Sequence, residues 1–468
     1  MLKFLKESNK IAYSLFLIFV IVFIVITIKG LKTPQPGDEN VYYYMGKLIT
    51  EGKTPYKDFF FAHPPLHIYL IALIYKLVGF KIIVLKLIPL VSTLISSKFI
   101  FSIAKNKFGY YEAVVSSFLF LFSYSVMFNS VFSFGIDVAA MFLVIGVYFL
   151  LNMDNHLLAG TFFGLAGITR LLSLVPVFIL FAVILLRNRK SFFKLSAAFF
   201  IILLLANASL LYLFGNEYAT SVYKFHLLKS FGGKENFREY LGIIKLNWFL
   251  FSSSLLFFFV KGKKQITVFA VISVIYMIFL STLKNFFGFY FIIIFPFLAI
   301  IGGYSIVNFF RGIFSKKFFA TRMSREIFLL LVLSIFIWNL ASDILFLQKV
   351  GFKGFERGKD VSDFINSNSN KNTVLFGDDS VVPLMALMTN KKIALDFVDT
   401  NPQVFISGVK DLSRVLADLK GKEVLFIIRS KQGISSFKVV REFLNGKCEM
   451  LSSFHDKTEG DYLVYGCR

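Results

Sequence analysis

Long apolar runs recur along this chain, and they constrain its fold more than any other feature. About 11 of them are candidates to cross a membrane, although two are short: residues 11–28, 82–104, 113–128, 138–151, 157–168, 171–186, 195–213, 246–260, 266–283, 286–309 and 327–347. Because 56% of the residues are hydrophobic, and 62 are Phe, a soluble protein could not cover this much apolar surface. The sequence predicts an α-helical polytopic membrane protein of about 11 transmembrane helices, in contact with membrane lipids.

Basic clusters indicate how these helices are oriented. The formal net charge is +23, but Lys and Arg fall between the apolar runs without an aromatic-interleaved basic face, so nucleic acid is not an expected partner. The apolar segment 66–80 is short for a ~20-residue crossing and carries His67 and Lys76. If it does not cross, every basic cluster between spans shares the side of the basic N-terminus. We therefore expect it to be an amphipathic or re-entrant helix at the outer surface.

This orientation gathers the polar loops on one extracytoplasmic face. They are the outer loop 29–81, the loop before Asp137, the turn at Arg170, the loop 216–245 and the segment around Lys284. The span interiors show no chain of ionisable groups and no pair of broken half-helices at mid-membrane depth, which a transporter is expected to have. Chemistry at the outer surface is therefore favoured over transport.

Residues 348–468 have a more polar composition and form the second predicted domain, after a transmembrane domain of residues 1–347. We expect a small extracytoplasmic α/β domain with helices at 381–388, 409–419 and 435–444, and strands at 373–376, 392–397, 423–428, 449–454 and 462–465. Asp379 and Ser380 lie between a strand and a helix, where ligands often bind, but a helix N-cap is the favoured interpretation. Cys448 and Cys467 form either one disulfide or two buried thiols.

Asp38 and Glu39 are the leading active-site candidates. They follow Pro34 and Pro36, which keep the first helix from continuing, and a carboxylate at a membrane exit costs solvation energy unless it is used. Such a group can accept a proton from a hydroxyl or hold a divalent metal. The alternatives are a solvated loop pair or the N-cap of a helix over residues 41–49.

The outer loop carries a family resemblance. Its Pro-Gly-Asp-Glu stretch at 36–39, Gly-Lys-Thr-Pro-Tyr-Lys-Asp at 52–58 and His-Pro-Pro-Leu at 63–66 resemble the first outer loop of the GT-C glycosyltransferases, on the branch of protein O-mannosyltransferases and aminoarabinose transferases. The resemblance implies a cell-membrane enzyme that uses a polyprenyl- or dolichyl-phosphate sugar and acts on a protein, lipid or glycan of the cell envelope. Other classes left open are a polyprenyl-linked glycan flippase and a non-catalytic subunit of a glycosylation complex.

The resemblance also implies roles for individual residues. Asp38 is the expected catalytic carboxylate of an inverting transfer, and Glu39 supports it. The expected donor-phosphate ligands are Arg170, Lys284 and His63, while acceptor or metal contacts are expected of Asp137, Asp58 and Tyr43. A divalent ion, Mg or Mn, between Asp38 and Asp137 stays open.

Several of these residues also have purely structural interpretations. Asp137 can cap its helix. Arg170 can extend to lipid headgroups. His63 can pack its loop against Asp58, and the intervening Pro64 and Pro65 make a zinc pair with His67 improbable.

Overall fold

A computed structural model of the chain describes residues 2–230, 233–314, 322–430, 432–457 and 460–467. The chain forms two compact units. Unit 1 comprises Met1–Leu31, Lys86–Ala206 and Gly232–Phe352, and unit 2 comprises Lys32–Leu85, Asn207–Phe231 and Lys353–Arg468.

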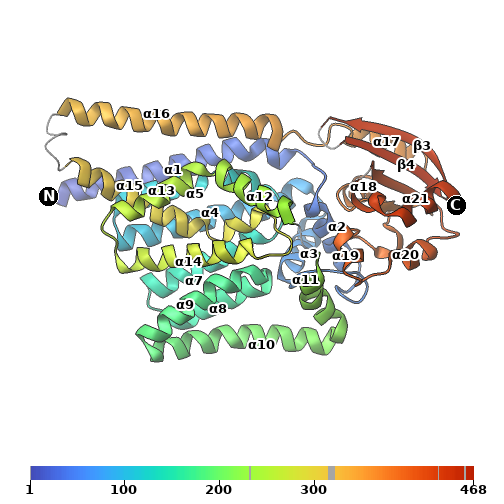
Figure 1. The fold of residues 1–468 in the computed structure, drawn as a ribbon, viewed down its shortest axis with the longest axis horizontal. Coiled ribbons are helices and arrows are strands. Elements are labelled where there is room, and N and C mark those ends of the chain that lie inside the picture. The colour runs from blue at the N-terminus through green and yellow to red at the C-terminus, as the bar shows by residue number, and fades with distance from the viewer. Residues whose placement is uncertain (1, 231–232, 315–321, 431, 458–459, 468) are drawn as a thin grey trace. The chain divides into compact units, whose positions relative to one another are not determined.

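Unit 1 is helical. Its longer helices are α1 (Leu2–Lys32), α4 (Ile82–Lys107), α5 (Tyr110–Leu121), α7 (Ile136–Asn152), α8 (His156–Thr169), α9 (Leu174–Arg187), the first part of α10 (Arg189–Ala219), α12 (Gly233–Leu246), α14 (Lys264–Ser281), α15 (Phe295–Phe314) and α16 (Arg322–Phe346). Unit 1 also contains the short helices α6 (Tyr124–Asn129) and α13 (Trp248–Leu255), and the 3₁₀ turns η1 (Leu171–Ser173) and η4 (Gly288–Ile293). Within the bundle, α7 packs along α8 and α5 packs along α15 (Figure 1).

Glycines allow close helix packing in this bundle. A Cβ on Gly160 of α8 would lie 2.2 Å from the Leu195 carbonyl oxygen of α10, and one on Gly146 of α7 would lie 2.5 Å from the Phe163 ring. Small residues let backbones approach in a bilayer, where the hydrophobic effect does not drive helices together. Dispersion contacts between the helices therefore account for much of the packing.

Six helices among the described residues are long and apolar enough to cross a membrane: Lys10–Lys32, Ile82–Lys107, Arg189–Leu228, Lys264–Ser281, Phe295–Ile313 and Leu333–Gly351. A seventh is added if Glu235–Leu246 and Trp248–Phe259, which meet at 76°, count as one span. The other predicted runs form apolar helices of 10–17 residues. The polytopic helical class is confirmed, and the number of about 11 spans stays a prediction.

Unit 2 joins the outer loop to a small α/β structure. The outer loop supplies α2 (Asp38–Thr50) and α3 (Leu66–Val78), and residues 207–231 supply the end of α10, the π-turn η2 (Thr220–Lys224) and α11 (Phe225–Leu228). The predicted helix over 66–80 is therefore present. Residues 216–245 are not the predicted loop, because α10, η2, α11 and α12 make nearly all of their described part helical.

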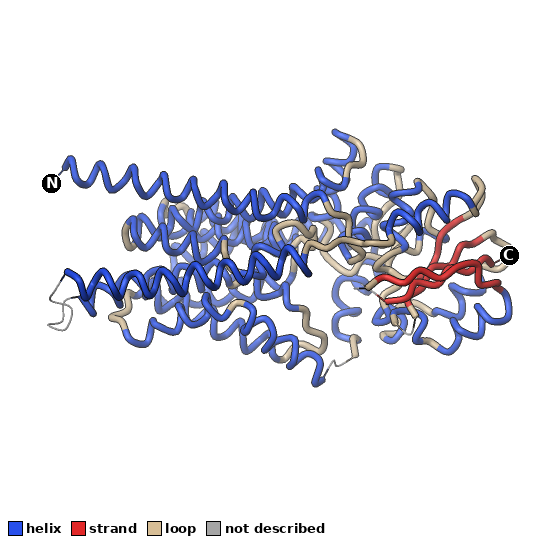
Figure 2. The backbone as a smooth tube through the Cα atoms, turned by 90° about the horizontal axis from the view of Figure 1, so that it is seen from above, coloured by secondary structure: helices blue, strands red, loops and turns tan. Residues whose placement is uncertain are grey.

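The strands of the C-terminal region form one sheet, drawn in red in Figure 2. Its strand order is β1-β2-β4-β3. Its strands are β1 (Val374–Gly377), β2 (Val424–Arg429), β3 (Cys448–Asp456) and β4 (Gly460–Cys467), with β1 parallel to β2 and the other pairs antiparallel. The helices around it are α17 (Gly358–Ser367), α18 (Val382–Thr389), α19 (Pro402–Ile406), α20 (Leu412–Asp418) and α21 (Lys438–Lys447). The α/β composition predicted for this region is correct.

One predicted strand, over residues 392–397, is wrong. Leu395 and Asp396 have positive φ angles of 59° and 51°, so the segment forms the 3₁₀ turn η7 (Ala394–Asp396). The segment pairs with the sheet through an isolated β-bridge between Ile393 and Leu375 of β1. The segment is apolar because Ala394 packs into the core of the C-terminal region, although no strand forms there.

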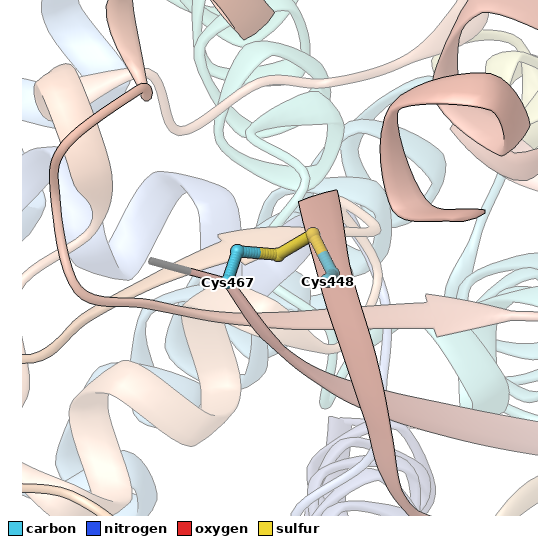
Figure 3. Close-up of a disulfide and its surroundings, with 2 residues drawn as sticks. All are labelled: Cys448 and Cys467. Carbon is cyan, nitrogen blue, oxygen red and sulfur yellow. A yellow bond between two sulfur atoms is a disulfide. The ribbon is translucent and has the colours of Figure 1, made fainter. Parts of the chain in front are cut away.

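Cys448 and Cys467 form a disulfide (Figure 3). The bond links the first residue of β3 to the last residue of β4, which are paired in the sheet and have Cα atoms 4.2 Å apart. Of the two alternatives that the sequence left open, the disulfide is the one formed. Such bonds persist in oxidising compartments, and the extracytoplasmic location of this region stays a prediction.

Candidate active site

Asp38 is the first residue of α2 and is half-buried. Gly37 precedes it as the N-cap, with φ 151°, and no side chain caps the helix, so the interpretation of Asp38 or Glu39 as an N-cap is wrong. Gly37 also donates its N–H to the Ser380 carbonyl oxygen at 2.8 Å. The start of α2 is therefore fixed against the loop that follows β1.

Glu39 differs from Asp38 in its surroundings. It is 1% exposed, so the interpretation as a solvated loop pair fails for this residue. The Tyr43 hydroxyl, which is fully buried one turn further along α2, donates to Glu39 Oε2 at 3.1 Å. The hydrogen bond between Glu39 and Tyr43 thus stabilises the first turn of α2, while the Asp38 side chain remains partly exposed to solvent.

The loop after β1 carries two acids with different environments. Asp378 is fully buried and paired: Arg429 Nε donates to its Oδ2 at 3.1 Å, and the Ser380 backbone and hydroxyl donate to its Oδ1. Val381, without a side-chain cap bond, is the N-cap of α18. The favoured interpretation of Asp379 and Ser380 as a cap is therefore wrong.

Asp379 and Asp399 form an acidic cluster with Asp38. Burial raises the pKa of Asp379 well above its usual range, and the charges of Asp378, Asp399 and Asp38 raise it further. Burial likewise raises the pKa of Asp399 to about 6; Asp38 adds to this effect, and the Asn401 N–H and Lys229 oppose it. We call Asp38, Asp379 and Asp399 the acidic cluster.

The sequence did not predict that two members of this cluster lie near Asp38. For Asp379 the signal was its position between a strand and a helix, which we interpreted as a cap. For Asp399 no local signal exists, because its electrostatic interaction with Asp38 depends on the fold.

The acidic cluster makes a prediction about stability. Because Asp399 binds its proton more tightly in the folded state, the folded protein loses stability as pH rises from about 4 to about 6. Asp399→Asn removes this charge and keeps an oxygen for the Asn401 N–H, so it should stabilise the protein at neutral pH by about 1–2 kcal/mol after solvent screening. Thermal unfolding of the purified chain at neutral pH and at pH below 5 measures the effect.

The gain should shrink toward acidic pH, where Asp399 of the wild type is protonated. Asp418→Asn, at an exposed position, is the matched control and should change neither midpoint. Equal stabilisation at both pH values would contradict the electrostatic origin of the effect.

His63 lies in the loop before α3, which begins at Leu66. Its ring stacks on His226 with centroids 5.4 Å apart, and His226 Nε2 lies 2.7 Å from the Ala62 carbonyl oxygen. Asp58 is exposed and accepts the Thr54 N–H at 2.7 Å, closing a turn. These contacts join the outer loop to α11.

Unit 1 holds Arg170 and Asp137. Arg170 is the C-cap residue after α8, and its side chain is 4% exposed, so it does not extend to the lipid headgroups. Its guanidinium donates to the Phe134 carbonyl oxygen and attracts Asp137 electrostatically. Asp137 lies in the first turn of α7, but Gly135 is the N-cap and no side chain caps the helix, so the capping interpretation of Asp137 is wrong.

Lys86 is a buried cation that was not among the predicted site residues. It is 0% exposed, its Nζ lies 4.6 Å from the Phe132 ring centroid, and it donates to the Gly30 carbonyl oxygen at 3.3 Å. Phe132 stacks on Phe134, whose carbonyl oxygen bonds Arg170, so Lys86 and Arg170 contact the same loop, 130–135. The signal for Lys86 was a lysine four residues into an apolar run, where a charge is costly.

Lys284 has a different position. It is exposed, and its carbonyl oxygen accepts a hydrogen bond from Asn236 at 2.9 Å. From the same segment, Phe289 stacks on Phe134 with centroids 4.7 Å apart. A phosphate contact by Lys284 stays a prediction.

A divalent ion has no ready site in the part of the chain that the structure describes. There, no group of three or more His, Cys, Asp or Glu side chains is placed to hold a metal ion. Asp38 and Asp137 belong to different units, so an ion shared between them stays a prediction.

Comparison with known proteins shows which proteins this chain resembles. The family model described as dolichyl-phosphate-mannose-protein mannosyltransferase matches residues 62–212. The structure of ArnT from Cupriavidus metallidurans matches with a TM-score of 0.68 at 12% identity in the apo state, and 0.65 at 13% when bound to undecaprenyl phosphate; each alignment covers 96% of this chain and 97% of that one. The chain resembles the GT-C membrane glycosyltransferases.

A second GT-C structure supports the same conclusion. The Archaeoglobus fulgidus oligosaccharyltransferase in its apo form matches with a TM-score of 0.55 at 11% identity, covering 88% of this chain and 69% of that one. No curated protein matches the sequence significantly. The GT-C likeness predicted from the outer loop is confirmed, and these identities concern the fold alone.

Proposed function

We propose that this GT-C-like protein transfers one sugar from a polyprenyl- or dolichyl-phosphate carrier to an acceptor outside the cytoplasm, with inversion. The observation that carries the proposal is Asp38, a half-buried carboxylate held at the start of a buried helix by Gly37 and Ser380. Protein, lipid and glycan acceptors all present a hydroxyl that such a carboxylate can deprotonate.

In the proposed reaction, each bond that forms is matched by a bond that breaks, and each proton has an acceptor. The acceptor hydroxyl gives its proton to Asp38, its oxygen bonds to the anomeric carbon, and the bond from that carbon to the carrier phosphate breaks. The phosphate leaves as an anion and needs little or no protonation, so one carboxylate suffices where glycoside hydrolases use two. Glu39, bonded to Tyr43, positions the turn that carries Asp38.

Lys86 and Arg170 are the proposed donor-phosphate ligands in unit 1. Both contact the loop 130–135 and both are buried, so a phosphate bound there would be screened little by water. ArnT from Cupriavidus metallidurans has been solved with undecaprenyl phosphate bound, which is consistent with a lipid-phosphate ligand for this fold. Lys284 and His63 remain proposed as secondary contacts.

Lys86→Met tests the donor site. The change removes the charge and keeps an apolar stem, so the KM for the lipid-phosphate donor should rise about tenfold or more while the protein stays folded. Initial transfer rates over a donor concentration series, together with the unfolding midpoint, measure both effects. Lys98→Met, an exposed position on the same helix, is the control; an unchanged donor KM in K86M would exclude Lys86 from this role.

The experiment for the function itself uses the full chain in proteoliposomes. Radiolabelled polyprenyl-phosphate sugar is supplied with a cell-envelope acceptor fraction, and label should move to the acceptor as free polyprenyl phosphate accumulates in equal amount. Movement of the lipid across the bilayer without product would instead identify a flippase. Transfer that occurs only after a partner protein is added would identify this chain as a non-catalytic subunit.

A further inference from the structure

One small cavity of unit 1 has polar side chains in its wall, although the surrounding helix bundle is apolar. The cavity has a volume of about 10 Å³, which is room for one water molecule or an ion of similar size. Asp343 and Asn339 of α16 and Tyr124 of α6 contribute its polar groups, together with residues at two helix breaks. Polar groups inside an apolar bundle are costly unless they are bound, so this cavity is a candidate ligand site.

α16 turns one face toward the cavity. Asp343 is the single acidic residue of the last candidate membrane span. Phe336, two helical turns before it, packs on Phe249 of α13 with ring centroids 4.2 Å apart. Phe346, three residues after Asp343, lies 5.6 Å from the Tyr124 ring. Since residues at these spacings share one side of a helix, the Asp343 side chain faces the bundle between two aromatic contacts.

Two helix breaks contribute to the wall of the same cavity. Residues 122–123 separate α5 from α6, and Asn247 separates α12 from α13. Asn247 accepts the Ser125 N–H at 3.0 Å and donates to the Ser125 hydroxyl at 2.7 Å, so it joins the two breaks and uses its own polar atoms to do so. The sequence predicted no broken half-helices, because neither break contains Gly or Pro.

The other three polar groups of the cavity have no partner inside the bundle. Asp343, Asn339 and Tyr124 form no side-chain hydrogen bond or ion pair with any other residue that the structure describes. A carboxylate, a carboxamide and a phenol supply oxygen atoms, which are the ligands that hard cations prefer. Because a single carboxylate is present, a monovalent cation makes the site neutral, whereas a divalent ion would leave an uncompensated charge in the bundle.

We propose that Asp343, Asn339 and Tyr124 bind one sodium ion in this cavity. The ion connects α16 to α6 and thereby fixes the last candidate membrane span against the bundle. The small volume of the cavity favours Na⁺ over the larger K⁺. The site is independent of the proposed function, because none of its three residues takes part in the proposed transfer of sugar.

Radioactive sodium measures this binding directly on the purified full chain in detergent. With choline replacing sodium at constant ionic strength, the wild type should bind one Na⁺ per chain in a saturable manner. Magnesium at the same concentration should not displace the ion. Absence of saturable binding, or its displacement by magnesium, would overturn the proposal.

Variants assign the ion to its three ligands. Asp343→Asn should abolish sodium binding, because the amide carries no charge. Tyr124→Phe keeps the ring that packs on Phe346 and removes only the hydroxyl, so it should weaken binding by about 3- to 10-fold, and Asn339→Leu should do the same. Asp154→Asn is the matched control in unit 1, with a side chain that is 93% exposed, and should bind like the wild type. Wild-type affinity in D343N would overturn the proposal.

Thermal unfolding distinguishes loss of the ion from loss of the fold. Sodium should raise the unfolding midpoint of the wild type relative to choline, because a ligand that binds only the folded state stabilises it, and it should leave the midpoint of D343N unchanged. If D343N shows no cooperative unfolding in either salt, Y124F decides, since it retains the aromatic packing. An equal sodium shift in the wild type and Y124F, with equal sodium affinity, would place the ion elsewhere and overturn the proposal.

Discussion

Asp38→Asn should lower the rate of sugar transfer by about 10²- to 10⁴-fold, the range over which a positioned general base contributes. Asparagine keeps the size of the side chain and the start of α2, where the Gly37 N–H bonds the Ser380 carbonyl oxygen. It cannot take the proton of the acceptor hydroxyl. The loss should therefore appear in kcat, measured with labelled donor and saturating acceptor, while donor KM changes little.

Glu39→Gln is the matched control for this change. The glutamine retains an oxygen for the Tyr43 hydroxyl, so positioning of the turn is largely preserved and the rate should fall by about tenfold or less. Equal losses in D38N and E39Q would mean that the pair acts as one structural unit. Full activity in D38N would remove Asp38 from the reaction altogether.

The helical fold and the outer-loop motif could be predicted because both are local in sequence. A run of apolar residues must satisfy its backbone as a helix in lipid, so residues 82–104 and 266–283 predict helices without knowledge of any partner. The proline-flanked Asp38 likewise stands out by its neighbours alone. The same logic gave the helix after His63, which begins at Leu66.

The rest of the site depends on contacts between distant residues. Asp399 is acted on by the charge of Asp38, more than 350 positions earlier in the sequence, and no pattern around Asp399 indicates this. Asp379 was visible but ambiguous, because a cap and a ligand site use the same residue types at the same place. Lys86 was not predicted as a site residue because the apolar run around it indicated only a transmembrane helix.

Gly377→Ala should have the largest effect on stability of any change considered for this chain. Gly377 ends β1 with φ 141°, a conformation that residues with a Cβ rarely adopt, and an added Cβ would lie 1.8 Å from the Ile427 carbonyl oxygen of β2. That oxygen accepts the Asp378 N–H at 2.8 Å, so it cannot move aside without breaking the link between the strands. We expect a loss of about 3–5 kcal/mol.

Gly421→Ala separates the clash from the effect of backbone conformation. Gly421 also has a positive φ, of 74°, but an added Cβ would meet nothing within 4 Å, so this change should cost only about 1–2 kcal/mol. Limited proteolysis of the full chain should show residues 353–468 cleaved rapidly in G377A and protected in G421A. Because Asp378, Asp379 and the Ser380 carbonyl follow Gly377 directly, G377A should also lose transfer activity with Asp38 intact. A G377A protein that resists protease yet loses transfer would show that the loop after β1 serves the reaction independently of the stability of the sheet.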